Sequence, residues 1–198
     1  MADAVPDPVP DQTETELWLV RHGETEWSRE GRHTSVTDLP LTESGVVVAK
    51  TLAERLDGLE FGLVLTSPRQ RARRTAELAG FAGARTEPDL VEWDYGDYEG
   101  LTTEQVRESV PGWTVWTHPC PGGESAEQVA ARLDRVVAEV RAYDGRALVF
   151  GHGHALRALA ARWVGQPASD GRLFRLDTAT VSTLGYERET PVVLRWNA

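Results

Sequence analysis

Three short segments combine histidine or arginine with residues that commonly begin helices, and each follows an apolar run directly. The segments are Arg21-His22-Gly23, Ser67-Pro68-Arg69-Gln70-Arg71 and Gly151-His152-Gly153-His154. Imidazole can act as a nucleophile or a base, while guanidinium groups and free helix N-termini both favour phosphate. A single such segment is weak evidence, because a histidine at a strand end usually packs or caps. Three together indicate one shared site for an anionic group.

The elements that must position these segments can be read from hydrophobic patterning. Short apolar runs typical of strands buried on both faces occur at Glu16–Val20, Gly62–Thr66 and Ala147–Phe150, with two closing strands at Thr180–Leu184 and Val192–Trp196. Helical patterns run over Thr42–Leu56, from Ser67-Pro68 onward, over Ser125–Tyr143 and from His152 to Val164. Ser67 is predicted to be an N-cap before a proline at the first helical position, and Ser125 with Gln128 to form a capping box.

Strands that alternate with helices predict an α/β fold, a three-layer α/β/α sandwich with a mixed, mostly parallel central sheet. In such sheets ligands bind beyond the carboxyl ends of the strands. The three histidine- and arginine-bearing segments are therefore expected to converge in one crevice. The acidic, proline-rich residues 1–14 are expected to be a disordered tail, and residues 15–198 a single domain.

Composition excludes several classes of protein. The chain has 198 residues and a formal net charge of −10, which argues against nucleic acid or an anionic membrane as the main partner. The single cysteine, Cys120, rules out an internal disulfide and is expected to be structural. The N-terminus lacks a secretory signal and no apolar run approaches the roughly 20 residues needed to cross a bilayer. We therefore expect a cytoplasmic protein.

Five motifs resemble those of one known family. They are Val20–Trp27 (VRHGETEW), Thr37–Thr42 (TDLPLT) with Gly45, Thr66–Ala72 (TSPRQRA) with Thr75, Glu92–Gly100 (EWDYGDYEG) and Gly151–Arg157 (GHGHALR). In order and spacing they resemble the histidine phosphatase (phosphoglycerate-mutase-like) superfamily over residues 17 to about 165. Residues 92–100 and Trp116–Glu124 (WTHPCPGGE) look particularly like the branch that contains mycobacterial acid phosphatases and fungal sedoheptulose bisphosphatase.

The resemblance implies a role for each central residue. His22 would be the nucleophile and form a phosphohistidine, with its attacking nitrogen aimed by a hydrogen bond from the other ring nitrogen to backbone. Arg21 and Arg71 would hold the phosphoryl oxygens, and His152 would donate to them. Glu92 would protonate the leaving oxygen and then activate water as a base.

Further residues are expected to bind substrate. The predicted substrate-binding set is Arg21, Ser28, Thr34, Ser35, Arg71, Glu92, His152 and Gly153. Asp94 and Glu99 are alternative candidates for the acid, because residues 87–99 hold six carboxylates. His154 and Arg157 could line the crevice, whereas His33 is expected at the surface.

The resemblance therefore implies a metal-independent, cofactor-free phosphomonoesterase, similar to an acid phosphatase. Its expected substrates are small phosphorylated metabolites such as sugar phosphates, with an acidic to neutral optimum, and a homodimer is possible. The first alternative is a cofactor-dependent phosphoglycerate mutase; it is disfavoured because residues 101–129 contain one basic Lys or Arg, Arg107. The others are a metal-dependent hydrolase built on His22, His152 and His154, and a phosphate-binding regulatory protein without catalysis.

Overall fold

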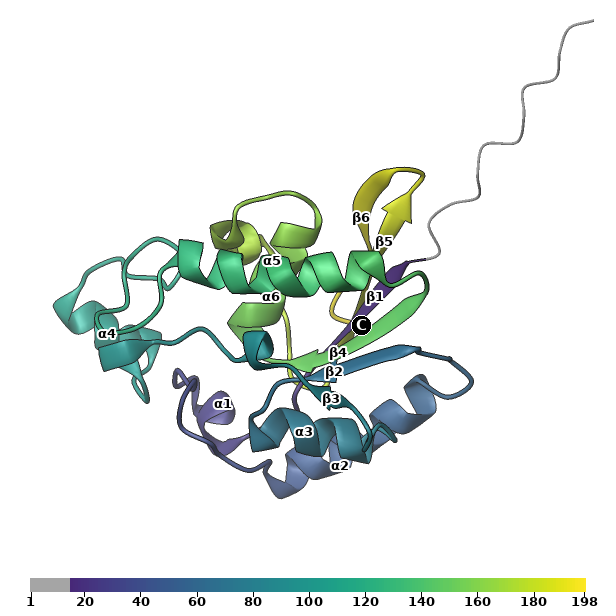
Figure 1. Ribbon diagram of the computed structural model, residues 1–198. Coiled ribbons are helices and arrows are strands. Elements are labelled where there is room, and N and C mark those ends of the chain that lie inside the picture. Colours follow the sequence, from purple (N-terminus) through teal and green to yellow (C-terminus); the bar gives the residue numbers. More distant parts are fainter. Residues whose placement is uncertain (1–14) are drawn as a thin grey trace, which may run out of the picture.

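The structure, a computed structural model, describes residues 15–198, so the tail predicted at 1–14 lies outside the described residues. A six-stranded sheet in the order β3-β2-β4-β1-β5-β6 forms its centre (Figure 1). The strands are β1 (Glu16–Arg21), β2 (Leu63–Thr66), β3 (Arg85–Thr86), β4 (Arg146–Gly151), β5 (Val181–Glu187) and β6 (Thr190–Arg195). Strands β1 to β4 are parallel, β5 is antiparallel to β1, and β6 is antiparallel to β5.

Helices cover both faces of this sheet (Figure 1). On one side lie α2 (Glu43–Arg55) and α3 (Gln70–Leu78), and on the other lie α5 (Ala126–Ala142) and α6 (Gly153–Trp163). The shorter elements are α1 (Glu26–Glu30), α4 (Thr103–Ser109) and the 3-10 turns η1 (Pro88–Leu90), η2 (Gly96–Tyr98) and η3 (Ala168–Leu173). The predicted three-layer α/β/α architecture with a mixed, mostly parallel sheet is confirmed.

The core is divided by the sheet into two apolar clusters. Along β4, Ala147 and Val149 join the cluster beneath α5 and α6, whereas Leu148 and Phe150 join the cluster beneath α2 and α3. This division follows from the two-residue side-chain period of a strand. All four side chains are fully buried, so β4 has no solvent-facing side, as its continuous apolar run predicts.

Capping residues set where two of the helices begin. Ser125 and Gln128 form the predicted capping box of α5, with each side chain accepting from the other residue's backbone N–H. The prediction for Ser67 is wrong, because α3 begins two residues later and its N-cap is Arg69. The Ser67 N–H donates to the Phe150 carbonyl of β4, so the pairing of β2 with β4 extends one residue past the end of β2.

Besides the 3-10 turns, three described elements, α1, α4 and β3, are absent from the predicted set. Strand β3 has two residues, and α1 and α4 have five and seven, so none is long enough to show a periodic pattern. Both short helices begin with a capping box, which is a local signal. Within residues 15–198, no helix is long and apolar enough to cross a membrane.

Candidate active site

The three histidine- and arginine-bearing segments meet at one edge of the sheet. Strands β2, β4 and β1 are neighbours, and Arg21 at the end of β1 is in register with Gly151 at the end of β4. The His22 N–H donates to the Gly151 carbonyl at 3.0 Å, which continues this pairing one residue further. The rings of His22 and His152 consequently lie edge to face with centroids 5.2 Å apart.

A cleft of about 230 Å³ opens at this edge. Six of the predicted site residues line it: Arg21, His22, Ser28, Thr34, Glu92 and Gly153. Arg71, His152 and Ser35 do not line it and are buried behind its wall. The other lining residues include Arg32, His33, Tyr95, His154, Arg157 and Leu176. The cleft is therefore polar and rich in cationic and imidazole groups.

His22 is buried, with 5% of its surface exposed, and its orientation is fixed by backbone. Its Nδ1 contacts the Gly23 carbonyl at 2.7 Å; because a carbonyl can only accept, Nδ1 carries the proton. Within the described residues no group is hydrogen-bonded to Nε2. Burial, followed by the charges of Arg71 and Arg21, lowers the pKa of His22 well below its ordinary value. The ring is thus neutral with a lone pair on Nε2, as a nucleophile requires.

Arg21 is a half-buried cation whose donors are incompletely used. One terminal nitrogen donates to the Leu176 carbonyl, but the buried Nε has no hydrogen-bond partner among the described residues. Burial lowers the pKa of Arg21, and the nearby charge of Glu92 opposes this shift. A Cβ atom at Gly153 would lie 3.4 Å from the Arg21 guanidinium carbon, so the first residue of α6 lies beside this group. Such an arrangement is suited to an incoming anion.

Arg71 is fully buried and is bound mainly by backbone oxygens. Its terminal nitrogens donate to the carbonyls of Thr34 and Thr37, each at 3.1 Å, and its Nε donates to His152 Nδ1 at 3.1 Å. Burial lowers its pKa, whereas Glu92 and Asp38 raise it. Arg71 therefore contributes charge beneath the cleft and connects the segment at 34–37 to His152.

His152 uses both of its ring nitrogens within the protein. Nδ1 accepts from Arg71, so the neutral ring carries its proton on Nε2, which lies 2.7 Å from Ser67 Oγ. Burial, with the charge of Arg71 next, lowers its pKa well below the ordinary value. Donation from His152 to a phosphoryl oxygen, as predicted, would require Nε2 to exchange Ser67 for that oxygen.

Glu92 reaches the cleft at the N-terminus of α6. Its Oε1 accepts from the backbone N–H groups of Trp93 at 2.9 Å and Ala155 at 2.7 Å, and its Oε2 accepts from His154 N at 3.0 Å. Two of these donors belong to the first turn of α6 and hold the carboxyl group at the N-terminus of that helix. The side chain is 5% exposed and is held in one place.

The two alternative acids, Asp94 and Glu99, bind backbone N–H groups elsewhere. The Glu99 carboxylate accepts from the backbone N–H groups of Ser35 and Thr37 at 2.9 and 3.0 Å, and Asp94 accepts from Gly96 N at 2.9 Å. Neither carboxylate lines the cleft. Glu99 instead fixes the segment that supplies carbonyls to Arg71, which leaves Glu92 as the lining carboxylate.

The hydroxyl groups predicted to bind substrate are partly engaged elsewhere. Ser28 Oγ accepts from Thr25 N at 2.9 Å in the capping box of α1, although Ser28 lines the cleft. Thr34 Oγ1 donates to the Arg32 carbonyl at 3.1 Å. Ser35 Oγ donates to the Glu92 carbonyl at 3.3 Å, so Ser35 contacts the backbone of the candidate acid and not the cleft.

Sequence reasoning missed part of the cleft wall. The surface position expected for His33 is wrong: 8% of the residue is exposed, its ring packs 4.7 Å from that of Tyr95, and burial lowers its pKa to about 4. The Tyr95 hydroxyl lies 2.6 Å from His154 Nδ1. Tyr95 belongs to the same motif as Glu92, three residues on, which is the one signal that could have identified it. Nothing in its type or spacing marks Leu176.

The alternative metal site would need free imidazole nitrogens from His22, His152 and His154. Nδ1 of His154 is engaged by Tyr95, and both ring nitrogens of His152 are engaged by Arg71 and Ser67. Over residues 15–198, no group of three or more His, Cys, Asp or Glu side chains is arranged to hold a metal ion.

Comparison with known proteins gives consistent matches. Residues 17–198 match the model of the histidine phosphatase superfamily (branch 1). An acid phosphatase of Mycobacterium tuberculosis is 46% identical over 175 residues, covering 86% of each chain. Sedoheptulose 1,7-bisphosphatase of Saccharomyces cerevisiae is 36% identical over 182 residues, 74% of this chain and 66% of the yeast protein. The solved structure of an M. tuberculosis open reading frame product superposes with a TM-score of 0.89 at 43% identity, covering 92% and 96% of the two chains.

Proposed function

Because this chain belongs to the histidine phosphatase superfamily, we propose that it hydrolyses phosphate monoesters of small metabolites through a phosphohistidine on His22. The observation that carries the proposal is the state of His22: its Nδ1 is bound to the Gly23 carbonyl, its Nε2 has no partner in the described chain, and it lines the cleft. A neutral imidazole held in this way is prepared to attack phosphorus.

The proposed first step transfers the phosphoryl group to His22. The Nε2 lone pair forms the N–P bond as the bond from phosphorus to the ester oxygen breaks, and Glu92 gives its proton to that leaving oxygen. Arg21, whose Nε has no partner within residues 15–198, neutralises charge on the phosphoryl oxygens. Gly23 accepts from Nδ1–H, which stabilises the positive charge on the phosphorylated ring.

In the proposed second step Glu92 accepts a proton from water as the water oxygen attacks phosphorus. The N–P bond breaks, inorganic phosphate leaves and His22 returns to its neutral form. Burial, followed by the charges of Arg71 and Arg21, lowers the pKa of His22, so the nucleophile stays unprotonated into the acidic range. This supports the acidic to neutral optimum expected from the sequence.

Small phosphorylated metabolites, including sugar phosphates, are the proposed substrate class. A cleft of about 230 Å³ with polar walls suits a small polar ligand. One relative supports the same class by its name, sedoheptulose 1,7-bisphosphatase, which specifies a sugar phosphate. No metal takes part in the proposed reaction, because arginine and histidine groups supply the positive charge.

The test traps the intermediate. Wild-type protein is mixed with a radiolabelled phosphomonoester, quenched in alkali and assayed for protein-bound label, with His22→Ala as the test variant. His118→Ala is the matched control, because His118 does not line the cleft. We expect alkali-stable, acid-labile label in the wild type and in His118→Ala, and neither label nor turnover in His22→Ala.

Three other outcomes would contradict the proposal. If His22→Ala releases phosphate as fast as the wild type, His22 is not the nucleophile. Activity that is lost on chelation and restored by a divalent cation would favour the metal-dependent alternative. Isomerisation of phosphoglycerate faster than phosphate release would assign the chain to the mutase reaction instead.

A further inference from the structure

We propose that Arg132, on α5, is a positioning residue that fixes the backbone of residues 89–92 and so places the Glu92 carboxyl in the cleft. The inference rests on the proton-donor role proposed above for Glu92. Arg132 does not line the cleft, and it enters neither step of the proposed reaction. It would act through Glu92.

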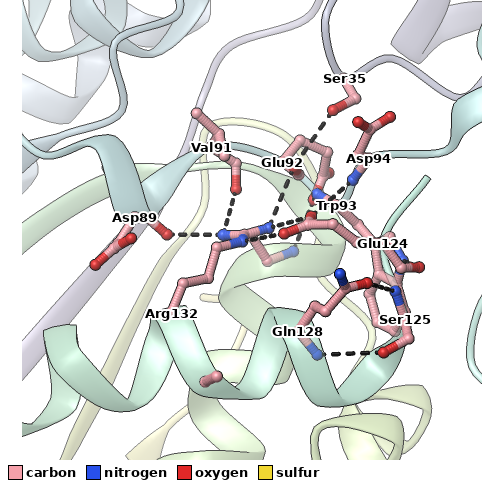
Figure 2. Close-up of polar contacts among 12 residues, drawn as sticks. Ser35, Asp89, Val91, Glu92, Trp93, Asp94, Glu124, Ser125, Gln128 and Arg132 are labelled. Carbon is pink, nitrogen blue, oxygen red and sulfur yellow. Dashed lines mark hydrogen bonds and ion pairs between the residues drawn. The ribbon is translucent and has the colours of Figure 1, made fainter. Parts of the chain in front are cut away.

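The Arg132 guanidinium uses all five of its N–H donors (Figure 2). Nε donates to Glu124 Oε1 at 2.8 Å, and Nη2 donates to Glu124 Oε2 at 2.9 Å and to the Glu92 carbonyl at 3.2 Å. Nη1 donates to the carbonyls of Asp89 at 2.7 Å and Val91 at 2.9 Å. Three carbonyls within four residues thus accept hydrogen bonds from one buried residue, Arg132, which is 7% exposed.

The hydrogen bonds from Arg132 satisfy carbonyls of residues 91–92 that no helix or strand satisfies. The 3-10 turn η1 ends at Leu90, and the chain from Val91 to Tyr95 belongs to neither a helix nor a strand. A buried carbonyl without a partner costs about 1–3 kcal/mol. The carbonyls of Val91 and Glu92 therefore depend on Arg132, assisted at Glu92 by the Ser35 hydroxyl.

Glu92 is consequently held at both ends by different helices. Its carboxylate is bound by the first-turn amides of α6, and its carbonyl is bound by a side chain of α5. The position of the carboxyl group relative to His22 is set by both attachments. A shift of about 1 Å in a catalytic group can cost 10²-fold in rate.

Glu124, the last residue of the Trp116–Glu124 segment, binds Arg132 and also contacts residues 93 and 94. It neutralises Arg132 through a bidentate pair, its Oε2 accepts from Asp94 N at 2.9 Å, and its carbonyl accepts from Trp93 Nε1 at 2.9 Å. Arg132 and Glu124 together bind every residue from 91 to 94 (Figure 2).

The experiment separates positioning of the acid from general stabilisation by varying the leaving group. An alkyl phosphate needs a proton on its leaving oxygen, whereas p-nitrophenyl phosphate has a leaving group that departs as an anion. Values of kcat/KM are compared for both substrates, because this ratio reports steps up to phosphoryl transfer. For Arg132→Lys we expect a loss of about tenfold or more on the alkyl phosphate and less than about threefold on p-nitrophenyl phosphate.

Arg135→Lys is the matched control. Arg135 lies one turn of α5 further on and pairs with the Asp89 side chain at 2.6 Å, but it is exposed and does not contact Glu92. We expect it to change neither substrate's kcat/KM. If Arg132→Lys does not fold, Glu124→Gln tests the same point, because it keeps the shape of Glu124 while weakening its hold on Arg132.

A double variant provides the deciding comparison. On the alkyl phosphate, Glu92→Gln with Arg132→Lys should be no slower than Glu92→Gln alone. Glu92→Gln already removes the acid, so misplacing residue 92 has no further effect on the rate. Equal losses on both substrates, or additive losses in the double variant, would overturn the positioning role while leaving the proposed function intact. A wild type that releases phosphate from neither substrate would instead remove the proposed function and this inference with it.

Discussion

Arg21 shows how a single residue can be unfavourable for folding and useful for binding. Arg21 is half-buried, and its Nε is buried without a hydrogen-bond partner among the described residues, which carries a desolvation cost. A phosphoryl group would supply the missing acceptors. The same residue should therefore affect activity strongly and the stability of the ligand-free protein little.

We predict that Arg21→Met lowers kcat/KM for a phosphomonoester by about 10²-fold or more, since removal of one preorganised donor typically has this effect. The melting temperature without ligand should not fall. Inorganic phosphate should raise the melting temperature of the wild type, by mass action on the native state, but not that of the variant. Thermal unfolding with and without phosphate measures both. Equal stabilisation of the two proteins by phosphate would show that Arg21 does not hold the anion.

At the scale of elements, the loop after β1 depends on a close contact with α2. A Cβ atom on Gly45 would lie 2.2 Å from the Glu24 carbonyl oxygen, and one on Gly23 would lie 2.7 Å from the Gly45 carbonyl oxygen. The backbone of the loop at residues 23–24 therefore contacts the backbone of α2 at Gly45 directly. The contact holds the loop that carries His22 against the first turn of the helix.

We predict that Gly45→Ala lowers the free energy of unfolding by about 1–3 kcal/mol, the usual range for overpacking, and also lowers kcat because the His22 loop must move. Urea unfolding and steady-state kinetics measure the two effects. Gly83→Ala is the control, because nothing lies within 4 Å of a Cβ there and its backbone needs no left-handed conformation. A Gly45→Ala protein as stable and active as Gly83→Ala would mean that the loop and the helix are not tightly coupled.

The sequence predicts elements best where a buried face repeats over many residues. The apolar runs at β1 and β4 are continuous, and the apolar positions of α5 recur with the helical period; the structure confirms all three elements. Residue 67 shows where local preference fails: a serine before a proline is a good helix start, yet Ser67 N pairs with β4 and the helix begins at Gln70. Tertiary context can thus override local propensity at the boundary of an element.

Convergence of the site was predictable, but the division of labour within it was not. Strand ends that are neighbours in a parallel sheet must bring His22 and His152 together, wherever they lie in the chain. Nothing in residue type shows that His152 spends both ring nitrogens on Arg71 and Ser67, or that the Ser35 hydroxyl contacts a backbone carbonyl. Burial of His33 was also hidden, because it lies in an irregular segment without a period.

For the molecule as a whole, charge is distributed unevenly. The chain carries a formal net charge of −10, yet the residues that line the cleft include three arginines, Arg21, Arg32 and Arg157, and one carboxylate, Glu92. The acidic charge therefore lies largely outside the cleft. This arrangement keeps the cleft suited to an anionic ligand although the chain as a whole is acidic.

The buried histidines make the whole molecule sensitive to acid. Burial lowers the pKa of His22, His33, His152 and His154 in the folded state, whereas the unfolded chain binds these protons near pH 6.5. Below that pH the unfolded state binds more protons than the folded state. Stability must then fall as the pH is lowered through 6.5 and continue to fall until the folded-state pKa is reached.

His33 allows this to be measured for one group. Its folded pKa of about 4 predicts that, between about pH 7.5 and pH 5, its titration alone removes about 2 kcal/mol from the free energy of unfolding. Urea unfolding at both pH values should show this loss in the wild type, added to those of the other three histidines. His33→Phe keeps an aromatic ring against Tyr95 but cannot titrate, so its loss over the same interval should be smaller by about 2 kcal/mol. If wild type and variant lose stability equally, His33 must be protonated in the folded protein, and its environment is more hydrated than the packing against Tyr95 and Trp113 implies.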